Sequence, residues 1–431
     1  MELGLKWKFI AWNNKIQLIG LSLLLVIALF AQIFATDQPL YVQYKGRTWF
    51  PAFSSLIHPE RTDSVIDPQT GTKEILQFDI TEWKELETES VIWAPIPWSP
   101  AKPDRLNRDY TGPFDEQMMK SDDGKITPST FRFRHHFGTD QLGNDLLSGI
   151  IHGCQTSLKI GLLSALIAGF FGIFLGALSG YYGNDGLRIS LGEYLFGWLG
   201  LLLGLFWGFI SRSNALHESF QTSFWLSTLQ VFLSCCFPIL GMIAFAFVGK
   251  IISGIFKGKN IAVPLDGIIQ RFTELFSAVP KILIILTLAA VFREKSVGLV
   301  IGIIGLSSWP TVCRFTRGEM LRIRSLNYIE AARSIGMSDF RIIFKHALPN
   351  AFTPIFTQLT LIVSGSILAE SSLSFLGIGV PDDVVTWGSI LSAGRQQFDA
   401  WWMVLFPGLA IFCSVLLFQS LGNSMQKESS H

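Results

Sequence analysis

The residue patterns that usually support catalysis or metal binding are incomplete in this sequence. A phosphate-binding loop combines backbone amides with a lysine and a hydroxyl side chain in the spacing GxxxxGKS or GxxxxGKT. The nearest string, GIFKGKN at residues 254–260, is one residue short and ends in asparagine, and no HExxH or GxSxG string occurs. His135 and His136 are adjacent, so their side chains do not face one point on regular structure, and we interpret them as loop surface and not as metal ligands. We therefore expect no catalytic residue, no metal site and no bound cofactor on this chain, which argues against an enzyme.

A basic segment, residues 314–350, carries the most distinctive ordered pattern in the chain. It predicts a first short helix over about residues 326–334, ended by Gly336, the residue type that closes a helix in the left-handed conformation. A second helix should start at Asp339, behind a serine that can cap it. It should end just before Pro349, because proline disfavours helical backbone in the preceding residue. On periodicity alone, such a hairpin is typical of a solvated amphipathic linker.

The composition places this pattern in a membrane protein. Of the 431 residues, 49% are hydrophobic and only 16% are charged, whereas soluble domains carry about 25% charge. This excludes a disordered chain, a coiled coil or an ordinary soluble enzyme. The net charge of +1 gives no reason to expect a nucleic-acid partner. The five cysteines form no CxxC pair, so neither a disulfide framework nor a zinc site is expected.

Eight apolar stretches approach the length of about 20 residues that crosses a bilayer. They cover residues 16–35, 160–180, 194–210, 224–248, 275–292, 297–313, 351–369 and 403–421. The first is too long for a signal-peptide core, and we interpret it as a retained anchor. Under this count the basic residues near the N-terminus, those at 250–259 and those at 314–350 fall on one side of the membrane. The positive-inside rule makes that side cytoplasmic, and both termini with it.

Three glycines and two ionisable residues within these stretches indicate how they are used. Gly172, Gly176 and Gly180 recur once per helical turn and predict a helix-packing face, either internal or toward a partner. Charged residues are costly in lipid and usually face a cavity or an interface. Glu370 and Lys281 are therefore candidates for lining a translocation path. Alternatively, Glu370 is a helix-end carboxylate at the interface and Lys281 snorkels to the cytoplasmic surface.

The polar stretch 37–133 lies outside the membrane under this topology. It is rich in proline and tryptophan, and extended pieces are plausible at residues 41–50 and 74–80. We interpret it as a small ordered cap on the membrane domain. The tryptophans are equally compatible with a belt at the membrane interface.

The hairpin sequence resembles the EAA motif of ABC importer permeases. The motif positions are Glu330, Ala331, Ala332, Gly336, Leu348 and Pro349, with His346 at the usual isoleucine position. In that family the hairpin carries a coupling helix that docks in a groove of the ATPase. The resemblance implies that Glu330, Ala331, Ala332 and Gly336 form this contact.

Two further segments resemble the dipeptide and oligopeptide permeases of the DppC/OppC branch. The string HFGTDQLGND at 136–145 is similar to their HPLGTDQLGRD, with Phe137 in place of proline and Asn144 in place of arginine, and ESSLSFLGIG at 370–379 resembles EASLSFLGLG. The outer segment is most similar to the YejE type of oligopeptide and microcin-C permease. Residues 187–263 match neither branch and add two spans that enter and leave on the cytoplasmic side.

The resemblance implies an all-α polytopic membrane protein with the MetI-like permease fold. We expect about eight transmembrane helices, a six-helix core plus the extra hairpin, and a long extracytoplasmic loop. The expected parts are 1–36 (cytoplasmic N-terminus and first helix), 37–155 (extracytoplasmic), 156–422 (permease domain, with the insertion 187–263 and the coupling loop 314–350) and 423–431 (cytoplasmic tail).

The function implied is that of a permease subunit in a bacterial inner membrane, forming half of a peptide pathway that opens by ATP-driven alternating access. Expected partners are two ATP-binding subunits or one fused, a second homologous permease, an extracytoplasmic solute-binding protein and membrane lipid. ATP and Mg²⁺ would be bound by the partner ATPase. Nickel or another small solute remains open as cargo, and a membrane-anchored enzyme or a channel remains as a competing function.

Overall fold

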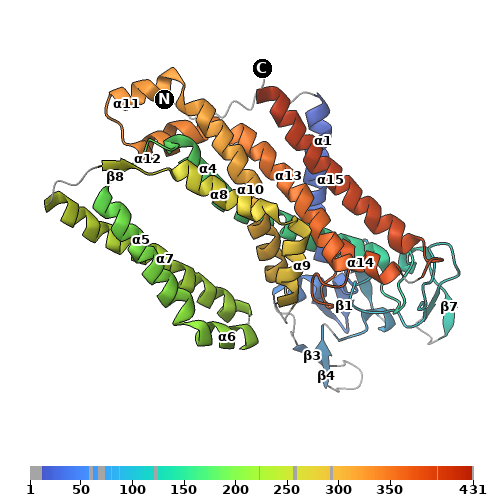
Figure 1. Ribbon diagram of the computed structural model, residues 1–431. Coiled ribbons are helices and arrows are strands. Elements are labelled where there is room, and N and C mark those ends of the chain that lie inside the picture. Colours follow the sequence, from blue (N-terminus) through green and yellow to red (C-terminus); the bar gives the residue numbers. More distant parts are fainter. Residues whose placement is uncertain are drawn as a thin grey trace. The chain divides into compact units, whose positions relative to one another are not determined.

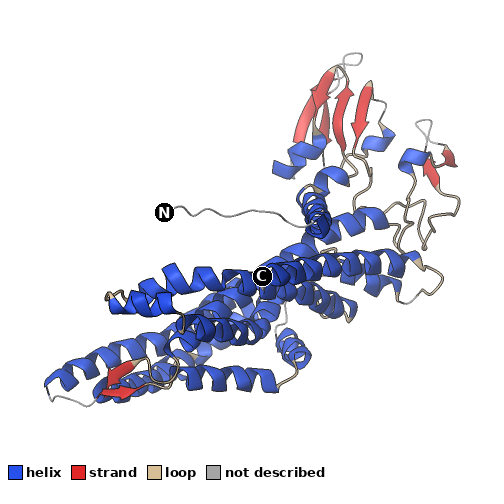
Figure 2. Cartoon of the chain, turned by 90° about the horizontal axis from the view of Figure 1, so that it is seen from above, coloured by secondary structure: helices blue, strands red, loops and turns tan. Residues whose placement is uncertain are grey.

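The computed structural model describes residues 12–57, 62–66, 73–78, 80–86, 88–120, 125–222, 224–255, 260–291, 295–395 and 397–429. Some of the basic residues that we predict to be cytoplasmic lie outside this part of the chain, namely Lys6, Lys8 and those in the stretch 256–259. Helices make up most of the described chain (Figure 2). It divides into two compact units, Met1–Leu162 with Val363–Leu421 and Leu163–Ile362 with Gly422–His431.

Six helices in the described ranges are long and apolar enough to cross a membrane. They are Leu146–Tyr182, Leu191–Ile210, Leu229–Gly254, Val297–Arg324, Asp339–Phe375 and Trp402–Gln426. A seventh span is available if Leu265–Ala278 and Lys281–Ala290, which meet at a bend of 76°, are taken as one. The bend falls next to Pro280, which precedes the first residue of the second helix. The N-terminal apolar helix Lys15–Leu29 is shorter than these. The membrane-length helices confirm a helical membrane protein, whereas the count of eight spans stays a prediction.

The first unit contains the outer segment and the helices next to it (Figure 1). Its helical elements are α1 (Trp12–Leu29), α2 (Ala31–Phe34), α3 (Pro51–Ile57), η1 (Trp83–Glu85), η2 (Phe131–Phe133), the first half of α4 (Leu146–Tyr182), the second half of α13 (Leu348–Phe375), α14 (Trp387–Gly394) and most of α15 (Trp402–Ser429). Its strands are β1 (Pro39–Tyr44), β2 (Arg47–Trp49), β3 (Thr62–Ile66), β4 (Lys73–Gln77), β5 (Ser90–Trp93), β6 (Met118–Lys120) and β7 (Ile126–Pro128).

The outer segment has its own hydrophobic core. Strands β2, β1 and β5 form an antiparallel sheet in that order, and β1 turns into β2 at Lys45 and Gly46, both with positive φ. The core cluster consists of Val42, Tyr44, Trp49, Leu76, Phe78, Trp83 and Trp93. Three of the four tryptophans in this segment are thus buried inside it, which favours the ordered cap over the interfacial belt. The predicted extended pieces correspond to β1, β2 and β4.

The second unit contains the remaining helices. They are the second half of α4, α5 (Leu191–Leu205), the π-turn η3 (Phe206–Ile210), α6 (Ser213–Thr222), α7 (Phe224–Ile255), α8 (Leu265–Ala278), α9 (Lys281–Val291), α10 (Val297–Arg324), α11 (Asn327–Ser334), α12 (Asp339–Ile342), the π-turn η4 (Ile343–Ala347) and the first half of α13, with strands β8 (Arg188–Ser190) and β9 (Asn260–Ala262).

The glycine stripe of α4 packs against α10. A Cβ placed at Gly172 would lie 2.5 Å from Cβ of Val312, one at Gly176 would lie 2.5 Å from the backbone oxygen of Cys313, and one at Gly180 would lie 2.6 Å from that of Arg317. Because each of these positions tolerates only hydrogen, the two backbones can approach closely. The stripe is an internal helix-packing face in this structure.

Helices α5 and α7 of the inserted segment lie side by side as a hairpin. Gly200 of α5 faces Gly241 of α7, and Gly192 faces Gly249, so that a Cβ at any of them would meet backbone of the other helix. The segment begins and ends at the antiparallel strands β8 and β9, which pair Arg188 through Ser190 with Ala262 through Asn260.

Candidate functional site

The turn between α11 and α12 is a Schellman motif centred on Gly336. The amide of Met337 donates to the Ala332 carbonyl and that of Gly336 to the Arg333 carbonyl, and Gly336 has φ +78°. This is the pattern that closes a helix with a left-handed glycine, and Met337 packs against the buried cluster to which Ala332 belongs. The predicted end of the first helix is therefore confirmed.

The second helix does not end at Leu348, which corrects the prediction. Helix α12 continues through the π-turn η4 directly into α13, so that 339–375 is one helical stretch. Pro349 is the second residue of α13. Proline is tolerated in the first turn of an α-helix, where amides have no intrahelical acceptor, and the π-turn re-registers the backbone just before it. The hairpin is therefore continuous with a membrane-length helix.

An aliphatic core lies beneath the hairpin. Its buried members are Ala177, Tyr181, Met320, Ile323, Ile329, Ala332, Ile342, Ile343, Ala347, Ala351 and Ile355. They come from α4, α10, α11, α12, η4 and α13, so every element of the hairpin packs on the same cluster. Ala332 is 7% exposed and belongs to this core, which places it inward and not on the outer surface with the other expected contact residues.

The outer face of the hairpin combines apolar and charged side chains. Glu330, Ala331 and Gly336 are exposed, Leu348 is half-buried and Pro349 is exposed. Ile335, Phe340 and Phe344 are exposed at 77%, 70% and 48%, and the last two rings pack on each other at 4.4 Å between centroids. Large apolar side chains presented among charges are typical of a protein-docking surface.

An ion pair fixes α8 to α10 next to this core. The guanidinium of Arg317 donates to both carboxylate oxygens of Asp266, at 2.5 and 2.6 Å, and the Ser179 hydroxyl at the end of α4 donates to the same carboxylate. The bidentate geometry is the strong form of this pair. This pair could not be predicted from local sequence, because the two residues are 51 positions apart. Arg271 and Glu274 pair at 2.9 Å on the exposed face of α8.

Glu370 lies inside the first unit. Its side chain is fully buried, and its carboxylate accepts from the hydroxyls of Ser374 at 2.8 Å, Ser157 at 3.3 Å and Ser371 at 3.4 Å. These hydrogen bonds link α4 and α13. Lys281 is exposed at the start of α9, directly after the bend. A role of either residue in a pathway stays a prediction.

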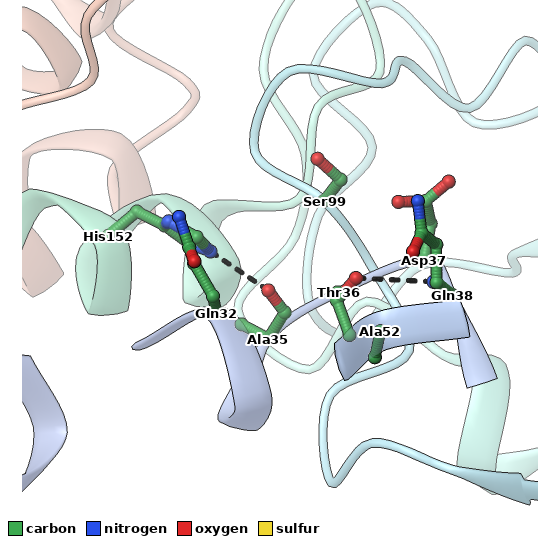
Figure 3. Close-up of a pocket in the computed structure, with 8 residues that line it drawn as sticks. All are labelled: Gln32, Ala35, Thr36, Asp37, Gln38, Ala52, Ser99 and His152. Carbon is green, nitrogen blue, oxygen red and sulfur yellow. Dashed lines mark hydrogen bonds between the residues drawn. The ribbon is translucent and has the colours of Figure 1, made fainter. Parts of the chain in front are cut away.

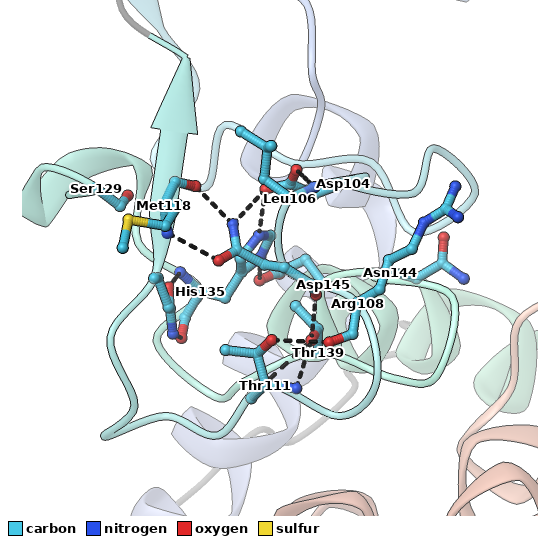
Figure 4. A network of polar contacts seen from close by, with 12 residues as sticks. Asp104, Leu106, Arg108, Thr111, Met118, Ser129, His135, Thr139, Asn144 and Asp145 are labelled. Carbon is cyan, nitrogen blue, oxygen red and sulfur yellow. Dashed lines mark hydrogen bonds and ion pairs between the residues drawn. The ribbon is translucent and has the colours of Figure 1, made fainter. Parts of the chain in front are cut away.

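A buried polar network surrounds His135 in the cap (Figure 4). His135 is fully buried, and its ring nitrogens lie 2.8 Å from Asp145 Oδ1 and 3.2 Å from Asp104 Oδ2. The expectation of a loop-surface histidine is therefore wrong for His135, which is buried. Two carboxylates compensate the cost of burying its ring. Burial lowers the pKa of His135, but the hydrogen bonds that its ring makes to the two carboxylates outweigh the effect of burial. The net result is a pKa above the usual range of histidine. Burial alone would raise the pKa of Asp104, but its hydrogen bond with His135 holds that pKa below the usual range of aspartate.

Asp145 also begins α4, because its other carboxylate oxygen accepts from the Ser148 amide at 2.7 Å, as an N-cap does. Asn144, where the resembling family has arginine, donates to Asp140 at 2.9 Å. Lys84 lies over the ring of Trp98, which stacks on His135. Burial lowers the pKa of Lys84 to about 7, against the attraction of Asp37 and Asp104. No group of three or more His, Cys, Asp or Glu side chains within the described residues is placed to hold a metal ion.

A polar pocket of about 210 Å³ lies in the first unit, between α2, the cap and α4 (Figure 3). It is lined by Gln32, Ala35, Thr36, Asp37, Gln38, Ala52, Ser99 and His152. Two of its ionisable side chains have partners in the protein: His152 Nε2 lies 2.8 Å from the Ala35 carbonyl, and Asp37 pairs with Lys102 at 3.0 Å. Because these two groups are already engaged, the hairpin surface is the stronger candidate site.

Comparison with known proteins agrees with the features described above. The family described as "Binding-protein-dependent transport system inner membrane component" matches residues 250–427, which include the whole hairpin. The chain is 26% identical to the inner membrane ABC transporter permease protein YejE of Escherichia coli over 398 residues, covering 91% of this chain and 86% of that protein. It is 28% identical to the di/tripeptide transport system permease protein DppC of Pseudomonas aeruginosa over 324 residues, covering 74% and 80%. A putative peptide transport system permease of Brucella suis is 27% identical over 70% of this chain and 78% of its own length.

Proposed function

This chain belongs to the family of ABC permeases for binding-protein-dependent peptide transport, and we propose that it forms one half of a peptide pathway opened by ATP-driven alternating access. As a family member it is a multi-pass inner-membrane protein and a transport subunit, not a catalytic chain. Such a system includes ATPase, second permease and binding-protein partners. In our proposal two ATP-binding subunits, or one fused, bind ATP and Mg²⁺, and a homologous permease completes the pathway.

The observation that carries the proposal is the hairpin α11–α12. It exposes Ile335, Phe340 and Phe344 on its outer face, while its inner face is bound to a core shared with α4, α10 and α13. An attached protein that moves this surface also moves the helices beneath it, because close-packed interiors transmit displacement. The hairpin has the properties of a lever gripped by a separate motor.

Each hairpin residue has a distinct part in this proposal. Glu330, Ala331 and Gly336 face outward and form the ATPase contact together with the exposed aromatic rings. Ala332 acts from beneath, because its small side chain lets α11 approach the core. Leu348 and Pro349 begin α13 and join the lever to that helix.

The proposed arrangement in the membrane has eight spans. It counts α1 and the bent pair α8–α9 as crossings, and it places the cap outside and both termini in the cytoplasm. The hairpin then faces the ATPase, and the cap lies where a loaded binding protein arrives. Peptides are the proposed cargo because the similar proteins of Pseudomonas aeruginosa and Brucella suis are described as peptide transport permeases.

Co-purification tests the proposal directly. We expect the tagged chain, expressed with the ATPase subunits and second permease of its own system, to recover an ATP-hydrolysing complex that imports a labelled tripeptide into proteoliposomes. Gly336→Pro should abolish the complex, because proline cannot adopt the positive φ of this turn. Glu330→Lys should weaken it, whereas Asp383→Lys, the same reversal on an exposed loop of the first unit, should not. A complex and uptake retained in both hairpin variants would exclude the coupling assignment.

A further inference from the structure

The hydroxyl of Tyr181, in the last turn of α4, touches both arms of the hairpin. It donates to Asp339 Oδ1 at 2.8 Å and accepts from Nε of Arg333 at 3.3 Å. Asp339 is the first residue of α12, and Arg333 is in the last turn of α11. One side chain of a membrane-length helix is therefore bonded to the residues on either side of the Gly336 turn.

The rest of Tyr181 is held firmly in place. Its side chain is 3% exposed and belongs to the aliphatic core beneath the hairpin. The guanidinium of Arg333 lies 4.8 Å from its ring centroid, within the range of a cation–π contact. Its backbone carbonyl and that of Gly180 accept from Arg324 at 3.4 and 3.3 Å. The hydroxyl therefore has a defined position, because the ring is held in the core at the end of α4 and the backbone beside it is bonded to Arg324 of α10.

The turn at Gly336 lacks packing of this kind. A Cβ at Gly336 would meet nothing within 4 Å, so the turn is held by its own two backbone hydrogen bonds and by Met337, and not by atoms packed against Gly336. Glycine also has the widest backbone freedom of any residue. The angle between α11 and α12 therefore also depends on contacts elsewhere along the two arms, and the Tyr181 hydroxyl is the polar contact that reaches both.

We propose that Tyr181 is a positioning residue that locks the angle of the coupling hairpin, so that a displacement of the hairpin passes to α4 and is not absorbed by bending at Gly336. The inference rests on the proposed function. It adds a second output to the lever, because α13 is connected through the chain, whereas α4 is connected only through side chains such as this one.

The test compares ATP use with transport in the complete complex. In proteoliposomes containing this chain, the second permease and the ATPase subunits, with binding protein and a labelled tripeptide, Tyr181→Phe should leave complex recovery and ATP hydrolysis unchanged or higher. Tripeptide imported per ATP should fall roughly threefold to tenfold, the range expected for the loss of one typical hydrogen bond. Asp339→Ala should show the same loss and Asp339→Asn a smaller one, because the amide oxygen still accepts from the hydroxyl.

Tyr194→Phe provides the matched control, since it removes the same atom from a half-buried tyrosine of α5 outside the hairpin core. An unchanged import per ATP in Tyr181→Phe would overturn the inference. So would an equal fall in complex recovery, hydrolysis and import, because that result indicates a merely structural role. If the unaltered chain recovers no ATPase, the proposed function itself fails, and the inference fails with it.

Discussion

The protein contains two helical hairpins with exposed apolar side chains, and they are built in opposite ways. In α5–α7 the helices pack on each other through glycines, and the outward residues Phe232, Leu240 and Phe247 are 64%, 63% and 64% exposed. In α11–α12 the helices are short, and they pack on a core supplied by α4, α10 and α13. The first hairpin is held together by itself, whereas the second is held by the helices it is expected to move.

The surroundings of the exposed residues explain the difference. On α7 the exposed apolar residues follow one another along a membrane-length helix. Only 11% of its most apolar stretch is buried, which is typical of a surface facing lipid. On the coupling hairpin Phe340 stands between Asp339 and Arg341, all three exposed. A charged border is compatible with a protein groove but not with the hydrocarbon layer. Exposure alone therefore does not identify a docking surface.

The largest expected effect comes from removing an exposed ring from each hairpin. Phe340→Ala should weaken ATPase association by about 2 kcal/mol, roughly thirtyfold, as loss of a central aromatic contact does. Phe247→Ala, with nearly the same exposure, should leave association unchanged. Quantitative pull-down of the ATPase with each variant measures both. Equal behaviour of the two variants would remove the distinction between the hairpins.

Glycine packing gives the next test. Gly200→Ala places a Cβ 2.2 Å from the backbone oxygen of Gly241, so we expect about 1–3 kcal/mol of destabilisation from overpacking. Gly302→Ala in α10 is the control, because nothing lies within 4 Å of its added methyl group. Thermal unfolding of the purified chain should show a lower midpoint only for Gly200→Ala. ATPase association below the midpoint should be normal for both, and its loss in Gly200→Ala would show that the two hairpins depend on each other.

The coupling hairpin was predictable from sequence because its signals are local. The closing glycine acts on neighbouring residues, and the structure follows it at α11. Helix α12 begins at Asp339 as predicted, although Ser338 makes no capping hydrogen bond with its side chain. Pro349 misled the prediction, because the same residue that ends one helix is acceptable in the first turn of the next. Tyr181 and the pair Asp266–Arg317 carry no local signal, since their partners lie 51 to 158 residues away. His135 was misassigned because the two carboxylates that compensate its burial lie elsewhere in the sequence, so that the neighbouring residues do not indicate a buried histidine.

A pH series distinguishes the cap from both hairpins, since the cap holds the buried His135 network. Its folded-state pKa is raised, so its contribution to stability is present below the unfolded value of about 6.5 and is lost as pH rises through the folded pKa. The lowered pKa of Asp104 adds a contribution that is lost as pH falls below about 3.9. The lowered pKa of Lys84 has the opposite effect, because it makes stability rise with pH above about pH 7. The quantity to measure is therefore the difference in stability between the original chain and His135→Gln.

That difference, measured by thermal unfolding followed through tryptophan fluorescence, should be larger near pH 5.5 than near pH 9. It should be the same in chains with and without α5–α7. A pH dependence that disappears with that hairpin would place the titrating group there instead.

The smallest effect is expected from deleting the α5–α7 hairpin. Strands β8 and β9 pair Ser190 with Asn260, so an Asn-Gly turn replacing residues 191–259 joins them as an ordinary two-residue β-hairpin. The contacts of α5 and α7 are made chiefly with each other, with α6 and η3 and with β8, so the remaining helices lose little packing. We expect ATPase association and tripeptide import within about twofold of the full chain, since weak surface contacts contribute little. Loss of the second permease from the deleted chain would instead identify the hairpin as a subunit-docking element, and its exposed face as a protein interface.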